Sequence, residues 1–397
     1  MTRNVVLALA ACCALAGVGC GSSSDESNDG ASSAASTVAA GDGASSVVAQ
    51  AKSHLNTYYS NSSVAPPADG PAAVKGKRVV FVDAGLSTPA GAEGARAVKE
   101  AGKLLGWKVS VFDGKFTPSV YQEGIRQAIS SKADGIVMFG VDCPLVKTAL
   151  EQAKQAKVPV VSASGQDCSQ SKDGGPELFS ASVEYPPLPG TKDTLSGFTQ
   201  WYGQGVAQAD WLIATTNGKA KVLLFEVPDF AVTDQLAQGF KDTIKKCSDC
   251  SIADTVKLGV KDFGPNLQDI AQQALLKNPS ADSVVGAYAD PMTLGIAGAI
   301  RTSGRADKLH VVAGTGNSDE LDLVRNDKGE NAGFVQVISW DMYGAFDQLN
   351  RIFAGTDLAV TGYPVTLYDK DHNLPASGPY VPKADYKSVF SKIWAGS

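Results

Sequence analysis

Four short apolar runs decide the fold of this chain: RVVFV at residues 78–82, KVSVF at 108–112, GIVMF at 135–139 and PVVS at 159–162. Each run is separated from the next by an amphipathic segment of helical length. Such alternation predicts parallel strands that are joined by right-handed helical crossovers. Ligands of open parallel sheets bind beyond the carboxyl ends of the strands, so the loops that follow these runs are the expected binding loops.

A second series of the same kind follows the first. A fifth strand is expected in the first series at 178–183, and a helix near Gly197 leads into the second series. Its strands are expected at 221–225, 253–258, 283–287, 310–314 and 333–337. A last strand at 363–367 and a helix from Asp385 to Trp394 end the chain. The pattern predicts an α/β protein of two doubly wound, Rossmann-like lobes around a cleft.

The composition is that of a globular protein with room for about two domains, since the chain has 397 residues and 44% of them are hydrophobic. The formal net charge is −6, and no run of basic residues occurs. This charge balance argues against a nucleic-acid partner.

We expect a monomer that needs no cofactor.

The N-terminus resembles a bacterial lipoprotein signal. Arg3 precedes an apolar run that ends in small residues just before Cys20. Residues 1–19 are the expected signal peptide, and Cys20 is the expected lipidation site. The alternative is a plain secreted protein that is cut nearby. Residues 20–46 have the composition of a flexible tether, and 47–75 are expected to form a helix and an extended connector.

Four further cysteines belong to the expected mature chain. An exported chain with an even number of cysteines permits disulfides. Cys143 and Cys168 follow strands that we expect to be neighbours, so a bridge between them is sterically plausible. Cys247 and Cys250 are close enough in sequence to close a local loop. A metal site is not expected, because neither pair has nearby histidines.

Short motifs along residues 76–367 together resemble the type I periplasmic solute-binding proteins, in particular the ribose-, galactose- and xylose-binding group. The segments that carry the resemblance are Lys103–Trp107, Ala133–Ile136, Val158–Val161, Gln238–Phe240, Asp290–Gly295, Val311–Val312, Asn326–Gly329 and Tyr363–Val365. LacI-type repressors share this fold, but they carry a DNA-binding segment where this chain has an export signal.

The resemblance implies a first lobe of residues 76–183 plus 338–363 and a second of 184–337 plus 364–397. Three hinge crossings are implied, near Val183–Glu184, Val337–Ile338 and Pro364–Val365. Ligand would bind between the lobes and stabilise the closed form, which an ABC permease with its ATPase would recognise.

The resemblance also points to an unusual ligand site. Four positions at which sugar-binding relatives carry Asp, Asn or Arg groups are Ser164-Gly165, Leu236, Ala289 and Thr315 here, so we expect a pocket less polar than a monosaccharide site. Asp290 and Asp341 are interpreted as possible helix caps. The candidate ligand-binding residues are Asp83, Ser87, Phe116, Asp142, Ser164, Gln166, Glu184, Asp229, Phe230, Tyr288, Thr315, Asn317 and Trp340.

An enzyme is not expected, because the sequence contains no nucleophile elbow, zinc-protease motif or phosphate loop. The predicted function is that of a lipid-anchored solute-binding protein of an ABC importer, on the extracytoplasmic face of a bacterial cell membrane. Its ligand would be a small sugar-like or aromatic molecule. The alternative is a ligand-binding component that presents the same ligand to a membrane sensor.

Overall fold

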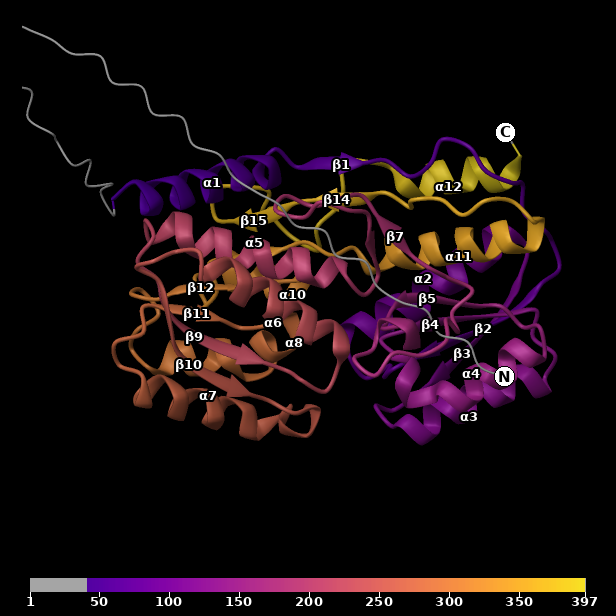
Figure 1. The fold of residues 1–397 in the computed structure, drawn as a ribbon, viewed down its shortest axis with the longest axis horizontal. Coiled ribbons are helices and arrows are strands. Elements are labelled where there is room, and N and C mark those ends of the chain that lie inside the picture. The colour runs from indigo at the N-terminus through magenta and orange to yellow at the C-terminus, as the bar shows by residue number, and fades with distance from the viewer. Residues whose placement is uncertain (1–40, 397) are drawn as a thin grey trace, which may run out of the picture. The chain divides into compact units, whose positions relative to one another are not determined.

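Two β-sheets of mainly parallel strands, each covered by helices, form two lobes in the computed structural model, which describes residues 41–396 (Figure 1). The predicted signal peptide, Cys20 and the tether up to residue 40 lie outside the described residues. The prediction of two doubly wound lobes is confirmed. None of the helices within residues 41–396 combines the length and the apolar composition that crossing a bilayer requires.

The first lobe contains five parallel strands in the order β3-β2-β4-β5-β6. They are β2 (Arg78–Asp83), β3 (Lys108–Asp113), β4 (Gly135–Phe139), β5 (Val160–Ser164) and β6 (Ala181–Ser182). The central strands β4 and β5 are almost entirely buried. Their continuous apolar sequence fits a parallel sheet that is covered on both faces.

The first-lobe helices are α2 (Pro89–Leu105), α3 (Pro118–Ser130), α4 (Cys143–Gln155) and α11 (Ile338–Ala354). Proline lies in the first turn of α2, α3 and α4, where its missing N–H leaves no hydrogen bond unmade. The Thr88 hydroxyl accepts a hydrogen bond from the Gly91 N–H at 3.1 Å and caps α2. Helix α2 therefore begins at a fixed point directly beside the strand ends.

The second lobe contains a six-stranded sheet in the order β10-β9-β11-β12-β13-β15, in which only β15 is antiparallel. Its strands are β9 (Lys221–Glu226), β10 (Ser251–Lys257), β11 (Ser283–Val285), β12 (His310–Ala313), β13 (Ala332–Phe334) and β15 (Leu367–Asp369). Its longer helices are α1 (Gly41–Tyr59), α5 (Gln200–Thr215), α6 (Ala231–Ile244), α7 (Pro265–Lys277) and α10 (Ser318–Arg325). A broken helical segment of α8 (Ala289–Pro291), η3 (Met292–Ile296, a π-helix) and α9 (Ala297–Thr302) follows β11.

Within residues 41–396 the chain passes between the lobes five times. The three predicted crossings are present, the first of them through the hairpin β7 (Glu184–Tyr185) and β8 (Leu195–Ser196). A fourth passage is β1 (Ser62–Val64), which pairs with β14 (Tyr363–Val365) on the way from α1 to β2. A fifth runs from β15 to α12 (Tyr386–Ala395). The passages through β1 and β14 lie along the upper side of Figure 1, where α1 and α12 also lie.

Three expectations are corrected by these elements. Residues 364–397 were expected in the second lobe, but α12 packs against α2 and α11 of the first. The single strand expected at 363–367 is two strands, β14 and β15, which belong to different sheets. Helix α1 begins at Gly41, inside the segment that the composition indicated as tether.

Both predicted disulfides are present, Cys143–Cys168 and Cys247–Cys250. The first joins the start of α4 to the loop after β5, so it fixes two loops that follow neighbouring strands. The second closes the turn between α6 and β10. Residues 41–396 contain no group of His, Cys, Asp and Glu side chains placed to hold a metal ion.

The packing of α12, to which the fifth passage leads, on the first lobe can be tested by mutation. Trp394 is buried, its indole N–H donates to the Asp347 carboxylate at 2.9 Å, and its ring stacks on Tyr343. We predict that Trp394→Ala lowers the free energy of unfolding by about 3–5 kcal/mol, because it leaves a cavity and an unpaired acceptor. Urea unfolding measures this loss. The exposed Val381→Ala is the matched control, expected within about 0.5 kcal/mol of the parent. A loss below about 1 kcal/mol for Trp394→Ala would show that α12 is not an integral part of the first lobe.

Candidate functional site

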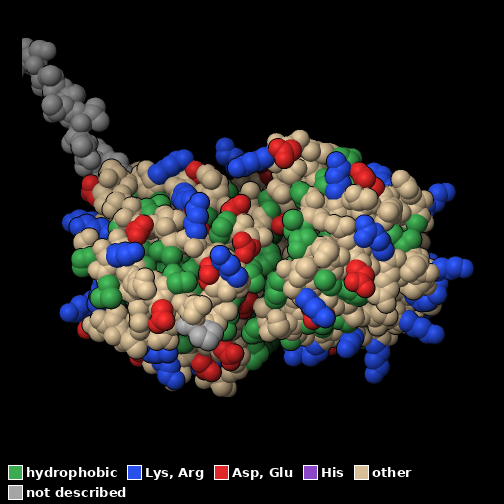
Figure 2. Space-filling model, turned by 90° about the horizontal axis from the view of Figure 1, so that it is seen from below, with side chains coloured by type: hydrophobic (Ala, Val, Ile, Leu, Met, Phe, Trp, Pro, Cys, Tyr) green, Lys and Arg blue, Asp and Glu red, His purple; other side chains and the backbone are tan. Residues whose placement is uncertain are grey.

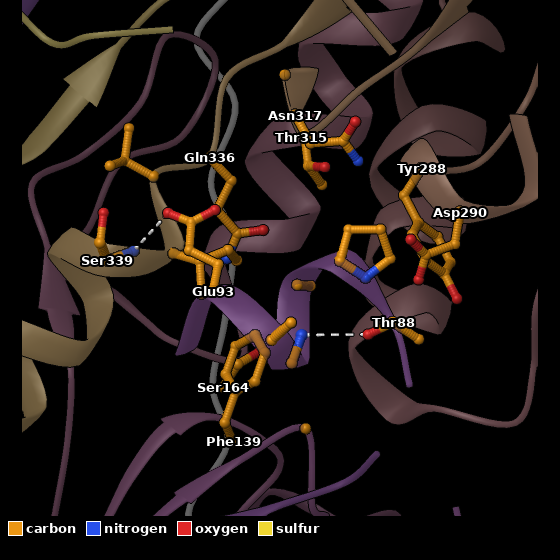
Figure 3. Close-up of a pocket in the computed structure, with 18 of the residues that line it drawn as sticks. Thr88, Glu93, Phe139, Ser164, Tyr288, Asp290, Thr315, Asn317, Gln336 and Ser339 are labelled. Atoms are coloured by element: carbon orange, nitrogen blue, oxygen red, sulfur yellow. Dashed lines mark hydrogen bonds between the residues drawn. The ribbon is translucent and has the colours of Figure 1, made fainter. Parts of the chain in front are cut away.

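A cavity of about 720 Å³ lies between the lobes. Figure 2, which views the molecule from below, shows a groove between the lobes, and Figure 3 shows side chains that line the cavity. Its walls come from the strand ends of both sheets, the hinge residues 336–339 and the fifth passage at 379–387. Of the predicted residues, seven line it: Asp83, Phe116, Ser164, Phe230, Tyr288, Thr315 and Asn317.

The first-lobe wall is built around the loop after β2. Asp83 ends that strand, and its Oδ1 accepts a hydrogen bond from the Gly85 N–H at 2.7 Å. The Phe116 ring lies directly on Gly85, where a Cβ would stand 2.2 Å from a ring carbon. Lys115 and Phe116 both adopt left-handed backbone conformations, with φ of 51° and 50°. Such conformations are unfavourable for non-glycine residues and here turn the Phe116 ring toward the second lobe.

The second-lobe wall is aromatic. Phe230 meets Phe116 edge-to-face across the cleft, with ring centroids 6.2 Å apart. Trp201 of α5 packs edge-to-face on Tyr288 at 6.1 Å and donates its indole N–H to the Ser164 hydroxyl at 3.3 Å. The lobes are therefore already in contact through these aromatic side chains.

Tyr288 and Asp290 lie together on one wall of the cavity (Figure 3). Ala287, just before them, has a left-handed φ of 59°. The fully buried Gln208 amide donates to the carbonyls of Ala287 and Ala313, at 2.8 and 3.2 Å, and so fixes the ends of β11 and β12. Asp290 is buried without capping a helix, and burial raises its pKa to about 6.

The backbone N–H groups of the Thr315–Gly316 loop are hydrogen-bonded within the protein. The Glu320 carboxylate accepts the N–H groups of Thr315 and Gly316 at 2.9 and 2.7 Å. Those donors are therefore unavailable to a ligand phosphate. Burial raises the pKa of Glu320 to about 7, and the neighbouring buried Glu330 has a pKa that burial raises further.

A buried polar link connects the hinge to the cavity. Gln336 lines the cavity and donates its side-chain N–H to Asp341 at 2.9 Å. The Tyr185 hydroxyl donates to the other Asp341 oxygen at 2.8 Å. Asp341 is thus held by two hinge residues, without a side-chain helix cap, and burial raises its pKa to about 7.

Six predicted residues lie outside the cavity. The Asp142 carboxylate accepts the N–H groups of Gln166, at 2.8 Å, and of Ala231 at the start of α6, at 3.0 Å, so it joins the lobes. Trp340, expected at the ligand, is instead fully buried, stacked on Tyr386 and bonded to the Thr361 carbonyl at 2.8 Å.

The other four are placed by local structure. The Gln166 side chain donates to the Gln170 carbonyl, and the Asp229 carboxylate accepts from the Val260 N–H. Ser87 is exposed, and Thr88 lines the cavity in its place. Glu184 belongs to the hinge strand β7.

Several cavity residues were not among the candidates. Phe139 ends β4 and Gly140 follows it, and their position at a strand end was the available signal. Gln336 and the segment 379–387 come from passages between lobes, which no local sequence pattern marks. Of the four substituted sugar-site positions, Ser164 and Thr315 line the cavity, whereas Leu236 and Ala289 are buried outside it.

A family model described as a periplasmic binding protein domain matches residues 92–356. A sugar ABC transporter structure from Yersinia enterocolitica has a TM-score of 0.65 and 17% identity, and the match covers 84% of this chain and 99% of that one. A Caulobacter myo-inositol binding protein has a TM-score of 0.62 and 19% identity, covering 76% and 95%. An ABC transporter solute binding protein from Agrobacterium vitis with bound allitol has a TM-score of 0.61 and 18% identity, covering 75% and 96%. A search of curated protein sequences finds no significant match.

The raised pKa of Asp341 predicts a pH-dependent stability. The folded protein keeps a proton on Asp341 up to a pH of about 7, whereas an unfolded Asp has released it, so this stabilisation is lost as pH rises through about 7. One such group lowers the free energy of unfolding by about 1.4 kcal/mol between pH 6 and pH 8. Asp83 and Glu320, with pKa values also raised to about 7, act in the same direction.

We predict that the parent protein is less stable at pH 8 than at pH 6, and that Asp341→Asn reduces this difference by about 1 kcal/mol. Urea unfolding at both pH values measures it. Asp319→Asn, at an exposed position of the same cavity, is the control and keeps the parent's difference. If Asp341→Asn keeps the parent's difference in the free energy of unfolding between pH 6 and pH 8, the pKa of Asp341 is not raised as described.

Proposed function

We infer the function of this protein from one premise: the chain belongs to the periplasmic binding protein domain family. Members of this family bind solutes as transport components and are not enzymes. We propose that this protein captures a small molecule in the cleft between its lobes and delivers it to an ABC permease. The cavity carries the proposal, because residues of both lobes line it together with the hinge.

Closure around a ligand is the physical basis of such a function. Phe116 of the first lobe and Phe230 of the second lie against each other, so a ligand beside them contacts both lobes only when the cleft is closed. A ligand that gains contacts only in the closed form shifts the population toward that form. The permease then has one conformation to recognise.

The proposed ligand is compact and has an apolar face. Phe116, Phe139, Trp201, Phe230, Phe263 and Tyr288 all line the cavity. Aromatic rings of this kind stack on the apolar face of a sugar-like molecule or on an aromatic ring. The sugar, polyol and inositol ligands of structural neighbours are compact molecules of the kind proposed here. Because the sequence predicts a pocket less polar than a monosaccharide site, an aromatic compound is the second candidate.

The cellular setting follows from the N-terminal sequence. We propose that the chain is a lipoprotein, anchored through Cys20 on the extracytoplasmic face of the membrane, and that it acts as a monomer. Labelling with a radioactive or alkyne fatty acid tests the anchor, and Cys20→Ser abolishes the label if the proposal is right.

A ligand screen tests the proposed function. We expect at least one sugar, polyol or aromatic compound to raise the melting temperature and to change the fluorescence of Trp201, the one tryptophan of residues 41–396 that lines the cavity. Phe230→Ala is expected to weaken the hit about tenfold, a loss of about 1.4 kcal/mol in calorimetry. Leu276→Ala, on the exposed side of α7, is the matched control with unchanged affinity. If no small molecule stabilises the protein, the proposal fails.

Gly85 gives a second prediction, about the first-lobe wall of the cavity. A methyl group at this position would overlap the Phe116 ring, so Gly85→Ala is expected to displace the ring from the cavity. We expect the affinity for the compound found in the screen to be about tenfold lower, with little change in the fluorescence of the unliganded protein. Gly94→Ala serves as the comparison, because a Cβ there would meet its neighbours only at ordinary contact distances of 3.4 Å or more, and Gly94 does not line the cavity. Equal affinity in Gly85→Ala and the parent would show that Phe116 does not contact the ligand.

A further inference from the structure

The cavity contains hydrogen-bond acceptors that the protein itself leaves unpaired. Asp290 is 7% exposed, and within residues 41–396 its carboxylate takes part in no hydrogen bond or ion pair that the structure shows. Oδ2 of Asp83 and Oε1 of Gln336 are also buried without a partner. Buried polar atoms are rarely left in this state, so these acceptors point to a ligand that donates.

The basic groups of the cavity are not placed to neutralise these carboxylates. Three basic residues line it, Arg96, Lys383 and Lys387. Lys387 forms an ion pair with Glu100 at 2.7 Å, and Lys383 donates to the Ser60 carbonyl. Arg96 is exposed. The inner part of the cavity is therefore acidic without a counter-charge from the protein.

The segment that carries Asp290 is constrained by its surroundings. Ala287 holds a left-handed conformation, the Gln208 amide fixes its carbonyl, and a π-helix begins at Met292 directly after α8. Left-handed non-glycine residues and π-helical turns both concentrate at functional sites. The constraint places the Asp290 carboxylate in the cavity wall beside Tyr288, whose ring meets Trp201.

We propose that the ligand carries a protonated amine, which binds the Asp290 carboxylate beside the Tyr288 ring. This proposal rests on the function proposed above and specifies the charge of its ligand. The cation would sit between a carboxylate and aromatic faces, the two kinds of group that attract organic ammonium ions. An amino sugar and an arylalkylamine are two classes of compact molecule with this chemistry, one for each ligand body considered above.

Charge separates an amine from a neutral polyol at this site. Hydroxyl groups can donate to Asp290, but they leave its negative charge buried without compensation, which is costly. An ammonium group donates and compensates together. Burial raises the pKa of Asp290 to about 6 and that of Asp83 to about 7, as is typical of carboxyl groups without a nearby cation.

The experiment compares matched pairs by calorimetry at pH 7 on the purified mature protein. Glucosamine is compared with glucose, and 2-phenylethylamine with 2-phenylethanol. The two pairs distinguish a ligand built on a sugar from one built on an arylalkyl group. We expect one of the amines to bind at least about tenfold more tightly than its neutral partner. Asp290→Asn is expected to remove that advantage and to leave the affinity for the neutral partner within about twofold. Asp269→Asn, at an exposed carboxylate of α7 that does not line the cavity, is the control with no effect on either compound.

The melting temperature of unliganded Asp290→Asn is an independent readout. Removing an unpaired buried carboxylate is expected to leave it unchanged or to raise it, and a fall would overturn the premise that the group has no partner. Equal binding of amine and neutral partner, or an amine advantage that survives Asp290→Asn, would overturn the proposal. If neither amine binds while neutral compounds of the wider screen do, the charge assignment is wrong and the transport function stands. If no compound binds at all, both fail.

Discussion

The five passages of the chain between the lobes are bonded to one another, and this constrains every motion of the cleft. The Thr361 N–H donates to the Glu184 carbonyl, and the Trp340 indole donates to the Thr361 carbonyl. The Tyr386 hydroxyl donates to Ser339 at 2.8 Å. A set of strands tied together along one side can bend but cannot slide, so the lobes can separate only on the opposite side. The cavity lies next to this hinge, and a small rotation there changes its walls.

Buried carboxyl groups hold the hinge and the binding loops in place, each in a different way. Asp341 binds two hinge residues, Glu320 holds the Thr315–Gly316 loop, and Asp142 bridges to the second lobe. Asp290 has no such role in the protein. The contrast supports its assignment to the ligand, since each of these three acids positions a group of the protein.

Sequence periodicity predicts the strands and helices well because it reports which side of each element is buried. It does not report the surface against which that side is buried. Helix α12 was therefore predicted, but not its place on the first lobe. Trp340 shows the same limit within the site, since an aromatic ring in the core and one at a ligand satisfy the same pattern. Asp142 was correctly expected at a strand end, but the N-terminus of α6 that it binds comes from 89 residues further along the chain.

The bond between Asp142 and the start of α6 has a consequence for the proposed import function. It joins the lobes through groups of the protein alone, and the negative carboxylate is favoured at the positive end of a helix. Each contact of this kind lowers the free energy of a closed but empty molecule relative to an open one. Because of this bond, closure takes up less of the ligand's binding free energy. The same bond reduces selectivity, since a permease that senses only closure would accept empty carriers. Tight binding of a dilute ligand favours a strong bond at this position. A carrier that stays open when it is empty favours a weak one.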